Sequence, residues 1–162
     1  VNPQRDGGPG HFHLVDMPGL GFARVPAAQR AAWRGFLRRY LVERPQLRLL
    51  LHLVDGQVGP VATDEALMKM VAEAQAEVAE APQPAADGAG EWSYTIVLTK
   101  MDKRGGKGAA ESERKVRRAL EKAGCRADIR VVCTSAKSRL GRDDMWRVMR
   151  PVVLPGEADE EE

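Results

Sequence analysis

Three short polar clusters have residue types suited to chemistry, and each directly follows an apolar run of the sequence. They are residues 16–19 (Asp-Met-Pro-Gly), 99–102 (Thr-Lys-Met-Asp) and 134–137 (Thr-Ser-Ala-Lys). Each cluster alone is short enough to occur by accident in many proteins. All three in this order, each at the end of a predicted strand, are more specific, because α/β proteins bind ligands at the carboxyl ends of their parallel strands.

The second and third clusters carry groups that suit guanine. The Asp102 carboxylate can accept two hydrogen bonds from the ring N–H and exocyclic amine of guanine, which adenine cannot offer in that arrangement. Lys100 has a long apolar stem that can lie across a purine face, and backbone N–H groups of Ser135 and Ala136 can face the guanine carbonyl oxygen. The alternatives are a surface aspartate in a loop and a serine turn that ends a strand. The predicted nucleotide-binding residues of these clusters are Thr99, Lys100, Asp102, Thr134, Ser135 and Ala136.

The first cluster carries groups that suit a phosphate and its metal ion. Asp16 can reach a magnesium ion through a water molecule, and Gly19 lets a backbone N–H approach a terminal phosphate that a side chain would block. The glycine-rich residues 18–22 are then expected to be a mobile segment that orders around a phosphate. The alternative is a tight strand-to-loop turn. The sequence assigns no residue a catalytic role.

Strands and helices must hold these clusters together. Residues 49–54 and 95–98 are almost continuously apolar, which is typical of strands buried on both faces of a parallel sheet. Strands are predicted over His11–Val15, Arg48–Val54, Tyr94–Thr99 and Ile129–Cys133, and helices over residues 27–43, 63–81, 110–123 and 143–149. Their alternation predicts an α/β fold, a doubly wound and mostly parallel sheet with helices on both faces.

Helical periodicity predicts which side chains face the core. On the first helix these are Trp33, Phe36, Leu37, Tyr40 and Leu41, and on the second they are Leu67, Met70, Val71, Ala74 and Val78. Thr63 or Asp64 is expected as the N-cap of the second helix, and Gly124 is expected to close the third.

The length of 162 residues suits one domain. We expect a polar lead-in at 1–10, the domain at 11–154 with a flexible insertion at 82–92, and an acidic tail at 155–162. Residues 103–108, rich in glycine and lysine, are expected to form a second mobile loop.

Composition excludes several classes of protein. The net charge is only +2, so no dedicated nucleic-acid-binding charge is present, and no apolar run approaches the length of a membrane span. Basic residues gather at 34–48 and 100–122, which indicates either ordinary solvated helix faces or a surface that touches RNA. Cys125 and Cys133 lack metal-ligand spacing, which favours two buried thiols in a reducing compartment.

Taken together, the motifs resemble the EngB/YihA family of ribosome-assembly GTPases. Residues 14–26 resemble its switch II, and further matches are 53–56 (Leu-Val-Asp-Gly), 97–103, and 134–137 with Gly141 and Met145-Trp146. Thr99, where most GTPases carry asparagine, is itself typical of this family. The resemblance covers about residues 11 to 150 and implies that 11–154 is a partial GTPase domain with a mostly Ras-like sheet.

The resemblance implies a protein that binds GTP or GDP with Mg²⁺ and helps the large ribosomal subunit mature. It would dock on rRNA and assembly intermediates when bound to GTP and leave after hydrolysis, with no membrane and no DNA as partners. Leu20 stands where Ras-type proteins carry the glutamine that positions water, so hydrolysis would need help from K⁺ or from rRNA. A degenerate, non-hydrolysing scaffold on rRNA or ribosomal protein is the alternative.

The sequence departs from the family in three respects. It contains no G-x-x-x-x-G-K-[ST] phosphate loop, it lacks the threonine-bearing switch I, and Gln57-Val58 replace the arginine and following residue usual in the family. We therefore expect a fragment whose absent first strand lies centrally in the sheet, and a GTPase only if a phosphate loop lies upstream. Alanine and arginine richness with the 82–92 insertion favours a mitochondrial or chloroplast location, and a bacterial cytoplasm is the alternative.

Overall fold

The computed structural model describes residues 12–17, 26–81, 92–103 and 106–154. Its three strands, β1 (Leu49–Asp55), β2 (Ser93–Thr99) and β3 (Arg130–Cys133), form one parallel sheet in the order β1-β2-β3. The helices are α1 (Ala27–Glu43), α2 (Ala62–Glu80), α3 (Gly106–Lys122) and α4 (Arg142–Val153). Strands and helices alternate along the chain from β1 onward, as predicted.

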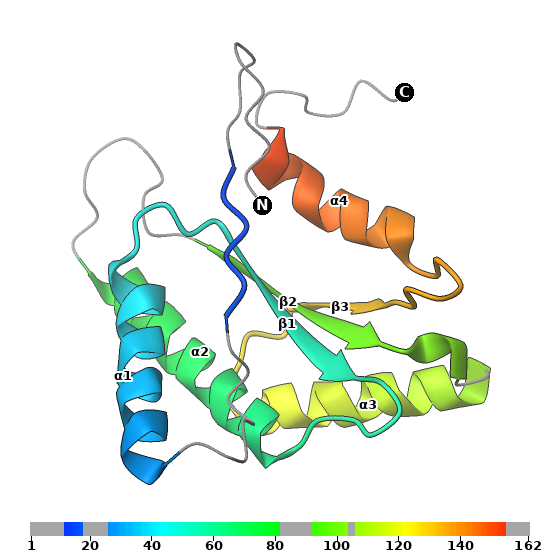
Figure 1. Ribbon diagram of the computed structural model, residues 1–162, viewed down its shortest axis with the longest axis horizontal. Helices are drawn as coiled ribbons and strands as arrows, with labels where there is room; N and C mark the ends of the chain where they lie inside the picture. The colour runs from blue at the N-terminus through cyan, green and yellow to red at the C-terminus, as the bar shows by residue number, and fades with distance from the viewer. Residues whose placement is uncertain (1–11, 18–25, 82–91, 104–105, 155–162) are drawn as a thin grey trace.

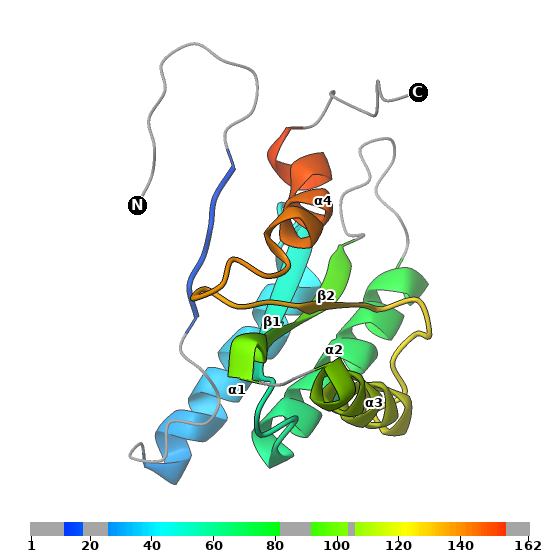
Figure 2. The same cartoon turned by 90° about the vertical axis from the view of Figure 1, so that its right-hand side faces the viewer.

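Helices cover both faces of the sheet. Figures 1 and 2 show α2 and α3 on one face and α4 on the other, while α1 packs beside α2. This arrangement confirms the predicted α/β fold with a parallel sheet. Because all three strands run the same way, the ends of β2 and β3 that precede the predicted base-reading clusters lie at the same edge of the sheet.

The strand predicted at His11–Val15 is wrong for the residues that the structure describes. Residues 12–17 belong to no strand, and the side chains of Leu14 and Val15 are 76% and 52% exposed. A strand needs a neighbour for its backbone N–H and C=O groups, and within the described part of the chain β1 pairs with β2 alone. Within the described residues this short apolar run therefore has no neighbouring strand to pair with. His11 itself lies outside the described residues.

The core lies between the sheet and α2, where Met68, Val71 and Ala74 pack against the buried residues of β2. Periodicity identified Val71 and Ala74 but missed Met68. On α1, Leu37 and Leu41 are buried as predicted, whereas Phe36 is 45% exposed, so the predicted inward face is wrong at that position. Phe36 instead stacks on Trp33 along the helix surface, with ring centroids 5.2 Å apart.

The ends of two helices correct other expectations. The N-cap of α2 is Val61 rather than Thr63 or Asp64, and the Asp64 carboxylate accepts the Val61 N–H at 2.8 Å. Gly124, with a φ of 75°, follows α3 and donates to Glu121 O, as its predicted closing role requires. The loop predicted at 103–108 is wrong for residues 106–108, which form the first turn of α3.

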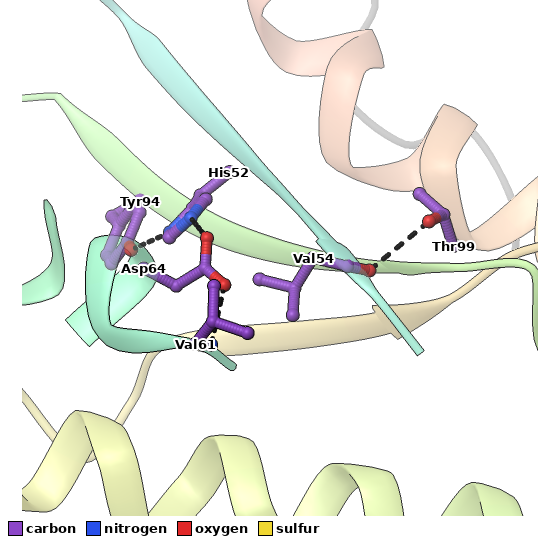
Figure 3. Close-up of polar contacts among 6 residues, drawn as sticks. All are labelled: His52, Val54, Val61, Asp64, Tyr94 and Thr99. Carbon is purple, nitrogen blue, oxygen red and sulfur yellow. Dashed lines mark hydrogen bonds and ion pairs between the residues drawn. The ribbon is translucent and has the colours of Figure 1, made fainter. Parts of the chain in front are cut away.

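A buried polar network ties the start of α2 to the sheet (Figure 3). His52 Nδ1 lies 2.7 Å from the Tyr94 hydroxyl, and His52 Nε2 lies 3.2 Å from Asp64 Oδ1. Burial acts to raise the pKa of Asp64, but hydrogen bonds from His52 and Val61 outweigh it and lower that pKa. Burial raises the pKa of Tyr94, so its hydroxyl stays protonated. The network thus sets the position of α2 against β1 and β2.

No helix in the described ranges is long and apolar enough to cross a membrane. The expectations for residues 1–10, 18–22, 82–91 and 155–162 fall outside the part of the chain that the structure describes. Trp92, the last residue of the predicted 82–92 insertion, is 5% exposed and its Nε1–H donates to Leu41 O at 3.1 Å, so the prediction of flexibility is wrong at that residue.

Candidate functional site

Two residues from the second and third polar clusters meet beyond the ends of β2 and β3. The Ser135 hydroxyl donates to Asp102 Oδ1 at 2.6 Å. The N–H groups of Lys137 and Ser138 both donate to Ser135 Oγ at 3.2 Å, so the serine proton is directed at Asp102. Ser135 is 3% exposed, whereas Asp102 lies at the surface. The sequence placed these two groups together, and the structure does the same.

The electrostatics of this pair favour an ionised aspartate. The hydrogen bond from Ser135 lowers the pKa of Asp102, with Lys137 and Lys103 acting in the same direction. An ionised carboxylate only accepts hydrogen bonds. Asp102 is therefore prepared to receive N–H groups from a ligand at the surface.

Backbone hydrogen bonds fasten the two clusters to each other. Thr134 N–H and Thr134 Oγ1 both donate to Leu98 O, at 2.7 and 3.1 Å, and Met101 N–H donates to Thr134 O at 3.0 Å. Thr134 is thus a link between strand ends. Its hydroxyl is occupied inside the protein, as is that of Thr99, which donates to Val54 O at 3.3 Å (Figure 3).

The Ser135 backbone N–H does not have its predicted role as a donor to guanine. Its N–H donates to Leu140 O at 3.0 Å, so it is unavailable to a guanine carbonyl oxygen. Within the described residues the Ala136 N–H makes no hydrogen bond, and Ala136 is exposed. Of the two amides that the sequence suggested, only Ala136 can serve a ligand. Ser135 contributes through its side chain instead.

Lys100 is tied to the neighbouring strand. Its Nζ lies 2.6 Å from Asp55 Oδ2, and its φ of 59° places its backbone in the left-handed region. Since Asp55 ends β1 and Lys100 follows β2, the lysine stem runs from one strand end to the next. The site prediction did not include Asp55, although it lies in the 53–56 motif that carried part of the family resemblance.

Gly56 lets the end of β1 approach the end of β2. Its N–H donates to Thr99 O at 2.9 Å, and its carbonyl accepts the buried Ser112 hydroxyl at 2.7 Å. A Cβ on Gly56 would lie 2.2 Å from Met101 Sδ and 2.6 Å from Thr99 O. No other residue type fits here without moving the strand end, a second structural feature of the site that sequence reasoning missed.

The phosphate-binding cluster is not assembled in the described residues. Asp16 lies exposed in an irregular segment, and Gly19 lies outside the described ranges. No group of three or more His, Cys, Asp or Glu side chains in the described ranges could hold a metal ion. Magnesium bound to a nucleotide takes most of its ligands from phosphates and water, so a single carboxylate fits at most the water-mediated part predicted for Asp16.

A separate cavity of about 580 Å³ lies at the other end of the sheet. It is lined by the first residues of β2 and β3, including Arg130, and by α4 from Arg147 onward. It shares no residue with the Asp102–Ser135 pair. The cavity therefore belongs to the amino ends of the strands, and the polar clusters belong to the opposite, carboxyl ends.

Comparison with known proteins identifies GTP-binding proteins as relatives of this chain. The sequence matches no protein-family model. It is 32% identical over 136 residues to the probable GTP-binding protein EngB of Acidobacterium capsulatum and 34% identical over 144 residues to that of Symbiobacterium thermophilum. These matches cover 84% and 89% of this chain but 54% of each relative. The chain thus spans about half the length of the curated relatives that it matches.

Solved structures support the fold. Translation elongation factor SelB of Methanococcus maripaludis in its apo form superposes with a TM-score of 0.59, at 17% identity, over 90% of this chain and 25% of SelB. Its complex with the GTP analogue GPPNHP superposes with a TM-score of 0.51 over 78% of this chain and 24% of SelB, also at 17% identity. This supports the α/β fold predicted from the strand and helix order, and it agrees with the Ras-like sheet that the family resemblance implied.

Proposed function

Because the chain belongs to the EngB family of GTP-binding proteins, we propose that the ends of β2 and β3 form the base-recognising part of a guanine-nucleotide site. The observation that carries the proposal is the 2.6 Å hydrogen bond between Ser135 Oγ and Asp102 Oδ1. This bond joins the exposed Asp102 carboxylate to the buried Ser135 hydroxyl, at the edge of the sheet where α/β proteins bind their ligands.

Recognition then follows from hydrogen-bond complementarity. Asp102, held ionised and oriented by Ser135, accepts the ring N–H and exocyclic amine of guanine, and Ala136 N–H donates to the guanine carbonyl oxygen. Adenine does not present a ring N–H next to an exocyclic amine in this arrangement, so it would leave the Asp102 carboxylate without hydrogen-bond donors. The apolar stem of Lys100 supplies a surface for the purine face.

A wider proposal concerns the activity that base recognition serves. We propose that base recognition serves GTP hydrolysis coupled to assembly of the large ribosomal subunit, with rRNA as the partner of the GTP-bound state. Mg²⁺ would be held by the phosphates, with Asp16 acting through water, and K⁺ would assist hydrolysis. An organelle, either mitochondrion or chloroplast, is the proposed location. The resemblance of the motifs and the relatedness to EngB proteins support the proposed activity and partner. Alanine and arginine richness and the 82–92 insertion support the proposed location.

A second candidate is a non-hydrolysing scaffold. The printed sequence contains no G-x-x-x-x-G-K-[ST] loop, and backbone N–H groups of that loop are what hold the phosphates of a nucleotide. The enzyme proposal requires such a loop and the scaffold proposal does not. The two proposals differ in whether phosphates add to the affinity for a guanosine ligand.

Titrations of the 162-residue chain followed by amide NMR test base recognition by the ends of β2 and β3. Guanosine should perturb the amides of residues 99–102 and 134–137, and adenosine at the same concentration should not. Asp102→Asn should weaken guanosine binding on the order of a hundredfold, because charge-assisted hydrogen bonds are lost, and should gain xanthosine binding, because an amide can donate to the extra carbonyl. If adenosine binds equally well, or the variant gains no xanthosine binding, Asp102 does not read the base.

GDP separates the enzyme from the scaffold when it is titrated into the protein expressed from the complete coding sequence, because the 162-residue chain has no phosphate loop under either proposal. Binding of GDP on the order of tenfold tighter than guanosine would show a phosphate-binding contribution, equivalent to about 1.4 kcal/mol. Equal affinities would favour the scaffold.

A further inference from the structure

We propose that Asp55 is a positioning residue for this base site: it holds the Lys100 ammonium at the end of β1 and so keeps that cation off the Asp102 carboxylate. The inference rests on the proposed function, because the competition it prevents is competition with guanine. It assigns a role to the 2.6 Å contact between Lys100 Nζ and Asp55 Oδ2.

A backbone hydrogen bond orients the Asp55 carboxylate independently of Lys100. Its Oδ1 accepts the Gln57 N–H at 2.9 Å, which leaves Oδ2 for Lys100. Its carbonyl oxygen accepts the N–H groups of Val58 and Gly59 at 3.2 and 2.8 Å, so the backbone around it forms a closed turn. The side-chain hydrogen bond from Lys100, followed by that from Gln57 N–H, lowers the pKa of Asp55, which is therefore ionised.

The two strand ends that carry the pair are held in register. Asp55 is the partner of Thr99 in the β1–β2 ladder, and the Gly56 N–H donates to Thr99 O at 2.9 Å. Lys100 follows directly, in a left-handed backbone conformation that L-residues seldom adopt. The stem of Lys100 is thus fixed at both ends, at its own backbone and at Asp55.

The alternative partner of Lys100 is Asp102, two residues further along. A free lysine is a mobile cation on a four-carbon stem, and Asp102 is an exposed, ionised acceptor that also attracts Lys137 and Lys103. An ammonium bound to Asp102 would occupy the oxygens that guanine needs. Pairing Lys100 with Asp55 removes this competitor while its methylene stem remains available to the purine face.

A double-mutant cycle on guanosine affinity tests the role. Asp55→Asn keeps an oxygen for the Gln57 N–H but loses the charge, and it should weaken guanosine binding about threefold, the scale of a partly exposed ion pair. Lys100→Met keeps an unbranched stem without the ammonium, and its own guanosine affinity is the reference for the second half of the cycle. In the Lys100→Met background, Asp55→Asn should have no further effect. Equal losses in both backgrounds would overturn the proposal.

Salt and a matched variant separate this role from damage to the fold. The loss caused by Asp55→Asn should shrink at about 0.5 M salt, because screening weakens the new Lys100–Asp102 attraction. Glu65→Gln breaks a comparable exposed pair, Lys122–Glu65 at 3.0 Å, and should leave guanosine affinity unchanged. A loss that persists unchanged at high salt, or that Glu65→Gln reproduces, would contradict the role of Asp55.

The pKa of Asp102 reports on the role of Asp55 without any ligand. Carboxyl NMR titration should show that Asp55→Asn lowers the pKa of Asp102 more when Lys100 is present than in the Lys100→Met background. In the second background only the loss of a distant negative charge remains. Identical shifts in the two backgrounds would overturn the inference, whereas failure of guanosine to bind would overturn the proposed function alone.

Discussion

Gly56 and Met101 lie so close that a Cβ on the glycine would stand 2.2 Å from the methionine sulfur. The same Cβ would lie 2.6 Å from the carbonyl oxygen of Thr99. The methionine side chain can move, but the carbonyl belongs to the β2 backbone that leads into Asp102. The close packing of the β1 and β2 ends therefore helps to set the position of the backbone that leads into Asp102.

Gly56→Ala should destabilise the protein by about 1–3 kcal/mol, the usual cost of inserting a methyl group into a packed region. Urea denaturation measures this free energy of unfolding. Gly35→Ala is the matched control, because nothing lies within 4 Å of its Cβ position in α1, and alanine should stabilise the helix by about 0.5–1 kcal/mol. Equal effects at the two positions would show that the β1–β2 contact is not tight.

Gly141→Ala should be more costly than Gly124→Ala. Both glycines have positive φ angles, 71° and 75°, so both variants carry the left-handed strain of about 1 kcal/mol. Only at Gly141 would the Cβ also strike a backbone atom, Cys133 O at 2.0 Å, while nothing lies within 4 Å of that position at Gly124. Thermal melting of the two variants checks the order, and a lower melting temperature for Gly124→Ala would contradict it.

Ser135→Ala should raise the pKa of Asp102, because the hydrogen bond that contributes most to lowering it is lost. Ligand binding that needs the ionised aspartate is present above this pKa and is lost as the pH falls through it. The acid limit of guanosine binding should therefore move to higher pH in the variant. Titrations at several pH values measure the shift, and Ser138→Ala, which keeps both the Ser138 N–H and the Ser135 hydroxyl, should leave the limit in place.

His52→Leu should destabilise the protein by about 1–3 kcal/mol, since it leaves the buried Tyr94 hydroxyl and the Asp64 carboxylate without their partner. Adding Tyr94→Phe removes one of these orphaned groups and should recover part of the loss. Denaturant unfolding of the single and double variants measures both steps. A double variant less stable than His52→Leu would mean that packing of the tyrosine, rather than the network, dominates.

The same network predicts how stability depends on pH. The folded-state pKa of Asp64 lies below its usual value of 3.8, so its contribution is present above that value and is lost as the pH falls through the folded pKa. Stability should therefore decrease in acid, and Asp64→Asn should flatten this part of the curve. Chemical unfolding between about pH 2 and pH 5 measures it, and identical slopes for parent and variant would exclude Asp64 as a contributor.

Local patterns in the sequence were enough to predict β2 and α1 and to place Asp102 near Ser135. The continuous apolar runs around Ile96 and the helical spacing around Leu37 depend only on neighbours along the chain, so β2 and α1 were predicted closely. A polar cluster at the end of each of two parallel strands must lie at the same edge of a sheet. For this reason the sequence alone predicts that Asp102 and Ser135 lie together.

Tertiary structure alone decided the partners of individual groups. The Ser135 N–H is occupied by Leu140 O, Lys100 is paired with Asp55, and the segment at 12–15 forms no strand, because each outcome depends on residues distant in sequence. Hydrogen bonds and ion pairs form only between groups a few ångströms apart. Sequence periodicity does not say which residues, distant along the chain, come within that distance of each other. The sequence by itself therefore determined which residues gather at the strand edge, and the fold decided which of their atoms remain free for a ligand.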